Sequence, residues 1–214
     1  MPFFPGATGQ IHYRRWPLGS GDGQASPRAG LVFLHGMGQH TGHYHRFAAG
    51  LAAHDIEMWG IDQAGHGLSE GTPGAPGALT DLADDAARLT EIAAGDRPGL
   101  PLVLMGHSLG AAVSVTLLRR GLAPFHAAVL CGTPKSVAQH EGTSDFADPR
   151  FPVLAIHGVD DRLAPIDGVR TWTSGLAGVT LREYPDIGHD LLHEKTHRTV
   201  TNDVADFVLG VTVS

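Results

Sequence analysis

The sequence of 214 residues contains a single cysteine, Cys131, so an internal disulfide bond is excluded. Cys131 follows an apolar run at 127–130, which predicts a buried thiol at the end of a strand rather than a nucleophile. No apolar run approaches the length that spans a membrane. The first residues lack the basic and apolar regions of a secretory signal peptide. We therefore expect a cytoplasmic protein with no stable membrane insertion.

Basic residues are also few. The chain has 15 Lys and Arg against 22 Asp and Glu, a formal net charge of −7. Nucleic acid is not expected as a partner, because binding to phosphates requires a basic patch and the sequence shows none. The 14 histidines are scattered rather than grouped at the spacing of metal ligands, so no metal site is expected. No organic cofactor is expected either. With 42% hydrophobic residues and no evident linker, residues 1–214 are expected to form one globular domain.

Short apolar runs alternate with segments of helical periodicity along most of the chain. The expected strands are residues 11–16, 31–34, 56–61, 102–105, 127–130, 153–156 and 179–184. The expected helices are residues 44–54, 79–94, 111–120 and about 195–209. Two of them show a clear apolar face, formed by Leu82, Ala86, Leu89 and Ala93 in one and by Val200, Val204, Phe207 and Val208 in the other. This alternation predicts an α/β fold, in which helices cover both faces of a mostly parallel sheet. In such folds the functional residues lie at the carboxyl ends of the strands.

One of these strand ends carries Gly106-His107-Ser108-Leu109-Gly110, directly before an expected helix. A Gly-x-Ser-x-Gly sequence between a strand and a helix is typical of a nucleophile elbow, a sharp turn that presents its serine. The two glycines lack a Cβ atom and let the strand and the helix approach closely. The same short sequence also occurs by chance in ordinary loops. Its interpretation therefore depends on whether a base, an acid and oxyanion donors occur at other strand ends.

An acid is expected at the end of a strand that follows the serine, because the base must be oriented by a carboxylate. Asp160 and Asp161 both follow the expected strand at 153–156. Aspartate is also common in turns, so one of the two is expected to form the turn and the other to orient the base. The spacing alone leaves this choice open.

The base is expected in a loop after a later strand. His189 follows the expected strand at 179–184 and precedes the last helix. The alternatives His193 and His197 fall in or near that helix, where surface or capping roles are expected. His157 lies at a strand end, where we expect a supporting or core role.

A tetrahedral intermediate also needs two N–H groups directed at its oxygen. The main chain of Leu109, the residue after the serine, is expected to supply one of them. Met37, within His35-Gly36-Met37-Gly38 at another strand end, is expected to supply the second. The glycines of this segment would let the main chain approach a substrate.

Taken in order, these motifs resemble the α/β-hydrolase superfamily, and more narrowly its monoacylglycerol lipase and lysophospholipase-like branch. The similar segments are residues 35–44, 62–69, 106–110, 158–163 and 189–194. The resemblance implies the α/β-hydrolase fold and a Ser-His-Asp triad. It selects Asp161 as the acid, since residues 158–163 fit Gly-x-x-Asp-Arg-Leu, and it places the base at His189. His35, Gly36, Gly38, Gly106, His107 and Gly110 would then support the site.

Two departures from this branch stand out. Gln39 occupies the position of a glutamate, and the segment that forms a helical cap in the branch is short here. Residues 135–150 are polar, with glycine, aspartate and proline, and are expected to form a residual lid or loop instead of an apolar lid. A minimal lid would open the site to water or to bulky substrates.

The expected function is therefore that of a serine hydrolase cleaving small-molecule carboxylic esters, either monoacylglycerol- or lysophospholipid-like or with smaller acyl groups. A thioesterase, a cyclase or a C–C hydrolase acting on a bulky biosynthetic substrate is the alternative. A non-catalytic binding protein of the same fold is the third hypothesis. A homo-oligomer that covers the rim exposed by the short lid also stays open.

Overall fold

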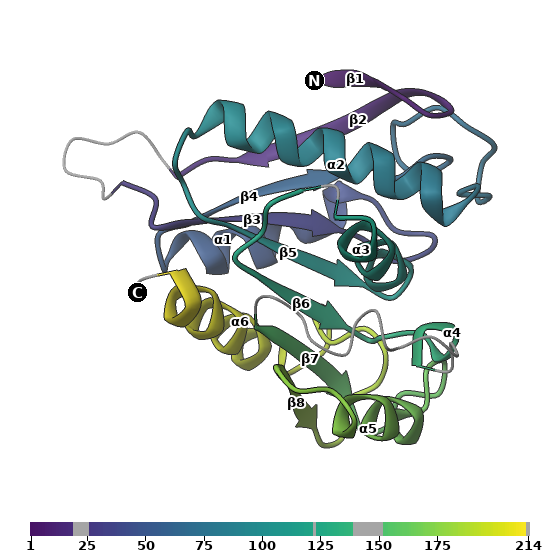
Figure 1. Ribbon diagram of the computed structural model, residues 1–214, viewed down its shortest axis with the longest axis vertical. Helices are drawn as coiled ribbons and strands as arrows, with labels where there is room; N and C mark the ends of the chain where they lie inside the picture. The colour runs from purple at the N-terminus through teal and green to yellow at the C-terminus, as the bar shows by residue number, and fades with distance from the viewer. Residues whose placement is uncertain (19–25, 122, 139–151, 213–214) are drawn as a thin grey trace.

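The structure is a computed structural model that describes residues 1–18, 26–121, 123–138 and 152–212. Its centre is an eight-stranded sheet with the order β1-β2-β4-β3-β5-β6-β7-β8 (Figure 1). The strands are β1 (Phe3–Gly6), β2 (Gly9–Trp16), β3 (Ala29–Leu34), β4 (Ile56–Ile61), β5 (Leu102–His107), β6 (Ala127–Cys131), β7 (Val153–Gly158) and β8 (Val179–Tyr184). The pairings from β4 to β8 are parallel, and β1 and β2 add an antiparallel edge. The predicted α/β fold with a mostly parallel sheet is thus confirmed.

Helices cover both faces of this sheet (Figure 1). They are α1 (His45–Ala52), which follows a 3-10 turn η1 (Thr41–Tyr44), α2 (Leu79–Asp96), α3 (Leu109–Arg119), α4 (Lys135–Ala138), α5 (Ile166–Ser174) and α6 (His197–Thr212). Side chains of α2, α3 and α5 pack on one face, and those of α1 and α6 pack on the other. The strands between them are buried on both sides, which explains why β3 to β7 appear in the sequence as continuous apolar runs.

The faces predicted for the two longest helices are confirmed. The expected inward residues of α2, which are Leu82, Ala86, Leu89 and Ala93, are all buried. In α6 the valines of the expected face are buried and Phe207 is half-buried. Cys131 is also buried, at the last position of β6, as its place after an apolar run predicted.

The sequence patterns did not reveal β1 or α5. Strand β1 has four residues, including a proline, and is held by antiparallel pairing with β2. Helix α5 buries only Ile166, Val169, Trp172 and Thr173, and it also contains a glycine, so its periodicity is weak. Both elements depend on the neighbours against which they pack.

The segment between β6 and β7 is described only in part. Helix α4 opens it, and most of the residual lid expected at residues 135–150 lies outside the described residues. In the part of the chain that is described, no helix is both long and apolar enough to cross a membrane.

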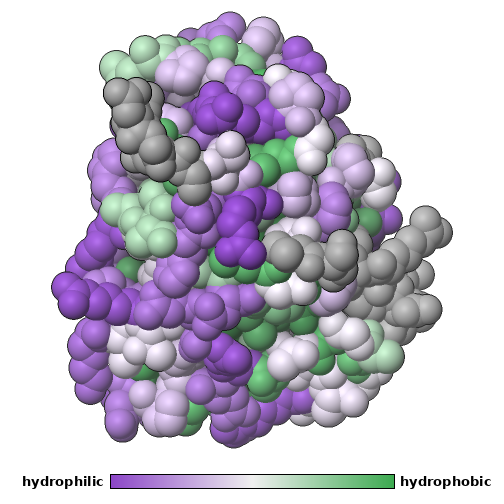
Figure 2. Space-filling model, turned by 90° about the vertical axis from the view of Figure 1, so that its left-hand side faces the viewer, coloured by the Kyte–Doolittle hydropathy of each residue, from purple (hydrophilic) through white to green (hydrophobic). Residues whose placement is uncertain are grey.

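The parallel strands point the same way, so their carboxyl ends form one edge of the molecule (Figure 1). The face at their amino ends is shown in Figure 2, where hydrophilic residues predominate and apolar residues appear in small groups. The predicted functional residues lie at the carboxyl ends, in the loops that follow β3, β5, β7 and β8.

Candidate active site

Ser108 occupies a sharp turn between β5 and α3. Its φ of 53° and ψ of −113° are unusual for a residue with a side chain and indicate local strain. A Cβ atom at Gly106 would lie 2.1 Å from the carbonyl oxygen of Gly110, and one at Gly110 would lie 2.0 Å from that of Leu34. Only glycine fits at these two positions, and the turn therefore has the geometry expected of a nucleophile elbow.

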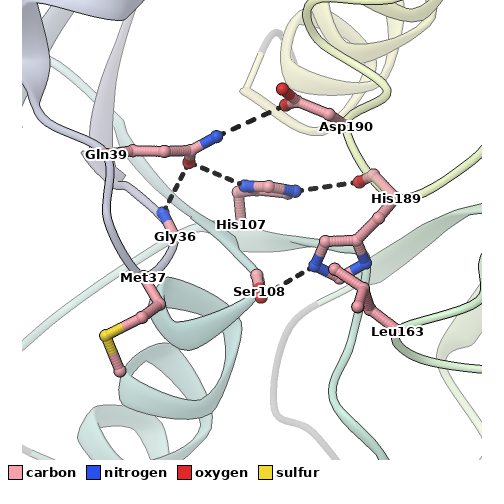
Figure 3. Close-up of a pocket in the computed structure, with 8 residues that line it drawn as sticks. All are labelled: Gly36, Met37, Gln39, His107, Ser108, Leu163, His189 and Asp190. Atoms are coloured by element: carbon pink, nitrogen blue, oxygen red, sulfur yellow. Dashed lines mark hydrogen bonds between the residues drawn. The ribbon is translucent and has the colours of Figure 1, made fainter.

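Two side chains from distant parts of the chain extend from this serine. His189 Nε2 lies 2.8 Å from Ser108 Oγ (Figure 3), and His189 Nδ1 lies 2.6 Å from Asp161 Oδ2. His189 is in the loop between β8 and α6, and Asp161 follows the end of β7. The structure therefore brings together the serine, base and acid that were predicted from the sequence.

The Asp161 carboxylate is buried and well supplied with donors. Its Oδ1 accepts hydrogen bonds from the N–H groups of Leu163 and Ala164, and its Oδ2 lies 3.3 Å from His157 Nε2. Burial alone would raise the pKa of Asp161, but the contacts with His157, His189 and Ala164 outweigh it and hold the pKa well below its usual range. Asp161 is therefore ionised at neutral pH.

In the described residues, the alternative acid and bases make no hydrogen bond to Ser108. Asp160 is exposed in the turn after β7. His193 bonds through Nδ1 to Asp190 and through Nε2 to the carbonyl of His43. His197 begins α6 and bonds to the carbonyl of Glu194. His157 is fully buried and supports Asp161.

The loop after β3 carries the expected oxyanion residue Met37. Met37 and Gly38 occupy the middle of a turn that the Gln39 N–H closes onto the carbonyl of Gly36, at 3.2 Å. Gly38 has a φ of +74°, which a residue with a side chain rarely adopts. Met37 lines the same pocket as Ser108, and its side chain points away from the serine (Figure 3). Leu109 is the first residue of α3, where main-chain N–H groups have no partner within the helix.

His35 supports this loop as a neutral imidazole. Burial lowers the pKa of His35 to about 4, since it penalises the charged form. In the neutral ring Nδ1–H donates to the carbonyl of Gly36 at 2.8 Å, and Nε2 accepts from the N–H of Gln63 at 2.9 Å. The Gln63 amide also donates to the carbonyl of His35. The ring thus ties the ends of β3 and β4 together.

These groups surround a cavity of about 270 Å³, which is enough for an ester group with a small substituent. The cavity is lined by Gly36, Met37, Gln39, His107, Ser108, Leu163, His189 and Asp190 (Figure 3). Two of its lining residues are exposed and apolar, Met37 at 53% and Leu163 at 77%. Within the described ranges, no group of three or more His, Cys, Asp or Glu residues is placed to hold a metal ion.

Residues 25–147 match the model of the family "Serine aminopeptidase, S33". The chain belongs to this family. Outside the matched range lie the strands β7 and β8 and the loops that carry Asp161 and His189. The family match therefore covers Ser108 and the loop that carries Met37, whereas the residues bonded to Ser108 are placed by the tertiary structure.

Two relatives of this chain are lipases of monoacylglycerols. The chain is 25% identical over 251 residues to the monoacylglycerol lipase of Mycolicibacterium smegmatis, a match that covers 86% of this chain and 89% of the relative. It is 29% identical over 167 residues to the monoglyceride lipase of Homo sapiens. That match covers 78% of this chain but only 54% of the human protein.

A solved structure shows the same fold. A soluble variant of the monoglyceride lipase from Saccharomyces cerevisiae, in complex with a substrate analog, superposes with a TM-score of 0.84 at 16% identity. The superposition covers 100% of this chain and 96% of the yeast chain. The α/β-hydrolase fold is thereby confirmed. At the level of class, the prediction of a carboxylic ester hydrolase similar to monoacylglycerol lipases is confirmed by the family and its relatives.

Three residues that line the pocket were not predicted as site residues. Gln39 appeared in the sequence only as a departure from a motif, and Asp190 only as the neighbour of the base. Leu163 follows the acid by two positions and is exposed at the pocket. Their positions next to strong motifs were the one available signal, because the contacts that they make join loops far apart in the chain.

Proposed function

We propose that this protein hydrolyses carboxylic esters through an acyl-enzyme formed on Ser108. The observation that carries the proposal is the chain of two short hydrogen bonds that joins Ser108 to His189 and His189 to Asp161. His189 accepts the Ser108 proton as the hydroxyl oxygen attacks the ester carbonyl, and returns it to the departing alcohol. Asp161 stays ionised and keeps the imidazole in the tautomer that accepts at Nε2.

The negative charge of the tetrahedral intermediate needs donors that are already in place. We assign this role to the main-chain N–H groups of Leu109 and Met37, one at the start of α3 and the other in the turn after β3. A water molecule then attacks the acyl group with His189 as the base, which releases the acid and restores Ser108. The scheme requires no cofactor.

For the substrate we propose a monoacylglycerol- or lysophospholipid-like ester or a smaller acyl ester, encountered in the cytoplasm. Two relatives are named as lipases of monoacylglycerols, which supports the first part. The limited volume of the pocket and its two exposed apolar lining residues support ready access by small esters. The chemistry at Ser108 would be the same for each of them.

Labelling with a fluorophosphonate probe tests the nucleophile directly. We expect one covalent adduct per chain, mapped by peptide mass spectrometry to Ser108. Ser108→Ala should lose both the adduct and the hydrolysis of p-nitrophenyl butyrate. Ser174→Ala, which changes an exposed serine at the end of α5, should keep both. An unlabelled Ser108 in active protein would contradict the proposal.

A substrate panel separates the ester from its alternatives. Turnover of p-nitrophenyl butyrate, of monoacylglycerols of increasing chain length and of acyl thioesters should be compared under one set of conditions. We expect kcat/KM to be highest on an oxygen ester. A clear preference for thioesters would instead assign the same triad to a thioesterase.

A further inference from the structure

The Gln39 amide lies at the centre of the proposed site, but the scheme above gives it no role. Its Oε1 accepts hydrogen bonds from the Gly36 N–H at 3.0 Å and from the Tyr44 hydroxyl at 2.5 Å. His107 Nδ1 lies 3.1 Å from the same oxygen. The Gln39 Nε2 donates to Asp190 Oδ1 at 3.4 Å. One side chain therefore uses both ends of its amide (Figure 3).

Three of these four partners each adjoin a different part of the proposed machinery. Gly36 precedes Met37, whose N–H is an assigned oxyanion donor. His107 precedes the nucleophile, and Asp190 follows the base His189. His107 also lies close to the base, since its Nε2 is 3.0 Å from the carbonyl oxygen of His189. The ring has one N–H when neutral, so it donates to only one of the two oxygens, Gln39 Oε1 or the His189 carbonyl. The loop after β3, the end of β5 and the loop after β8 thus meet at the Gln39 side chain.

We propose that Gln39 is a positioning residue, which sets the relative placement of the oxyanion loop, the nucleophile and the base through its amide. The proposal rests on the proposed ester hydrolysis at Ser108. Position 39 needs an amide rather than a carboxylate, because its partner Asp190 is itself a carboxylate. Gln39 and Asp190 form a matched donor and acceptor.

The surroundings of Asp190 explain why Gln39 must donate this hydrogen bond and Asp190 accept it. Its carboxylate also pairs with His193 Nδ1 at 2.7 Å. Burial alone would raise the pKa of Asp190, but its hydrogen bonds with His193 and Gln39 hold the pKa below its usual range. Asp190 is therefore an anion, and it can accept a hydrogen bond but not donate one.

A glutamate at position 39 would remove the donor and bring two carboxylates into contact. Two carboxylates at this distance do not both stay ionised at low cost, so they either share a proton or move apart. The other titratable groups facing position 39 are Tyr44 from η1, His107 from β5 and His193 beyond Asp190. Burial lowers the pKa of His107 to about 4, so this ring is neutral and cannot balance a second negative charge.

Movement of these loops by a fraction of an ångström should affect the chemical step more than binding of a small ester. Misplacement of catalytic groups by about 1 Å costs on the order of 100-fold in rate. We therefore expect Gln39→Glu to lower kcat for p-nitrophenyl butyrate by about 10- to 100-fold at pH 8, with KM changed by less than about threefold. Gln10→Glu makes the same chemical change at an exposed position in β2 and should leave both constants unchanged.

The decisive variant is the double substitution Gln39→Glu with Asp190→Asn. It restores one donor and one acceptor with their places exchanged. In the native protein Gln39 and His193 both contact the same oxygen, Asp190 Oδ1. The new amide at position 190 must therefore rotate, so that its nitrogen donates to the carboxylate at position 39 while its carbonyl accepts from His193. We expect kcat of the double variant to exceed that of Gln39→Glu by at least about fivefold. A residue that only fills space would show no such rescue.

The pH dependence provides a readout that loss of packing would not. In Gln39→Glu, one shared proton on the two carboxyls removes the repulsion. The ratio of its kcat to that of the native protein should therefore rise as the pH falls from 8 to 5.5. Gln39→Met removes the amide without adding charge, so its deficit, also about tenfold, should be the same across this range.

The outcomes separate this proposal from the proposed function. If Ser108→Ala retained turnover, the ester hydrolysis scheme would fail. If Ser108→Ala is inactive and Gln39→Glu turns over at the native rate at pH 8, only the positioning role is overturned. A double variant no faster than Gln39→Glu would also overturn it. If Gln39→Glu fails to fold, Gln39→Met tests the positioning role instead. A kcat of Gln39→Met equal to that of the native protein would overturn that role.

Discussion

Asp161 Oδ2 lies 2.6 Å from His189 Nδ1, and the same carboxylate accepts two main-chain hydrogen bonds through its other oxygen. The carboxylate is thus held by its own turn before it contacts the imidazole. His157 approaches from β7 and completes its environment. Because these donors are fixed by the backbone and the core, Asp161 offers the histidine a charge whose position does not depend on a substrate.

The first prediction concerns the choice between the two adjacent aspartates. Asp161→Asn should lower kcat on p-nitrophenyl butyrate by about 1,000- to 10,000-fold, because an amide can hold the imidazole in the wrong tautomer. Asp160→Asn is the matched control and should keep nearly full activity, since Asp160 is exposed in the turn. Steady-state kinetics of both variants would decide the matter. Equal losses in the two variants would contradict the assignment of Asp161.

The second prediction concerns stability and pH. The lowered pKa of Asp161 means that its ionised form stabilises the folded state at pH values above its unfolded pKa of about 3.9. That contribution should disappear as the pH falls below this value towards the folded pKa. We expect the native protein to exceed Asp161→Asn in unfolding free energy by about 2 kcal/mol at pH 7, and this gap to narrow below about pH 4.

Urea denaturation at several pH values measures this gap. A gap that stayed constant from pH 7 to pH 3 would show that Asp161 is not stabilised as an anion. Asp160→Asn again serves as the control, because no comparable set of buried donors is described around Asp160.

The third prediction concerns the elbow glycines. Gly110→Ala would place a methyl group 2.0 Å from the Leu34 carbonyl oxygen, which the packed backbone of β3 cannot relieve. We expect a loss of at least about 3 kcal/mol in unfolding free energy, or failure to fold. Gly95→Ala, near the end of α2, meets no other described atom within 4 Å and should stabilise the protein by about 0.5–1 kcal/mol. Thermal unfolding followed by circular dichroism compares the two.

The fourth prediction concerns Asp85, which lies beneath the N-terminal hairpin. Its Oδ1 accepts a hydrogen bond from the Ala7 N–H, whereas its buried Oδ2 has no partner among the described residues. Burial raises the pKa of Asp85, so its ionised form costs stability as the pH rises above the unfolded value. Asp85→Asn should therefore raise the melting temperature at pH 8, by an amount that corresponds to about 1 kcal/mol.

Below about pH 4 the native carboxyl is itself protonated in both states, so the advantage of Asp85→Asn should vanish. Differential scanning calorimetry at pH 8 and pH 4 measures both values. A destabilised Asp85→Asn at pH 8 would show that the carboxylate is stabilised by its surroundings after all.

The architecture could be predicted from the sequence because buried parallel strands leave a strong signal. Their residues face helices on both sides, so β3 to β7 appear as apolar runs between periodic segments. The elbow could be predicted for a related reason. Steric contacts at Gly106 and Gly110 exclude every other residue, and that requirement is visible in the sequence as a glycine pair around Ser108.

Other features were hidden because they depend on partners far away in the chain. Strand β1 exists through its pairing with β2, and α5 through the core that it covers. The choice between Asp160 and Asp161 was open by spacing alone. The two residues differ in the direction of their side chains, which the turn after β7 sets.

The sequence by itself determined the fold class and the strand ends at which Ser108, Asp161 and His189 lie, because apolar periodicity and glycine sterics are local properties. Only the tertiary structure decided which atoms meet at that edge. It placed the Gln39 amide between Gly36, His107 and Asp190, residues up to 151 positions away from it. Hydrogen bonds between loops depend on side-chain directions that packing sets, and no local pattern in the chain records them.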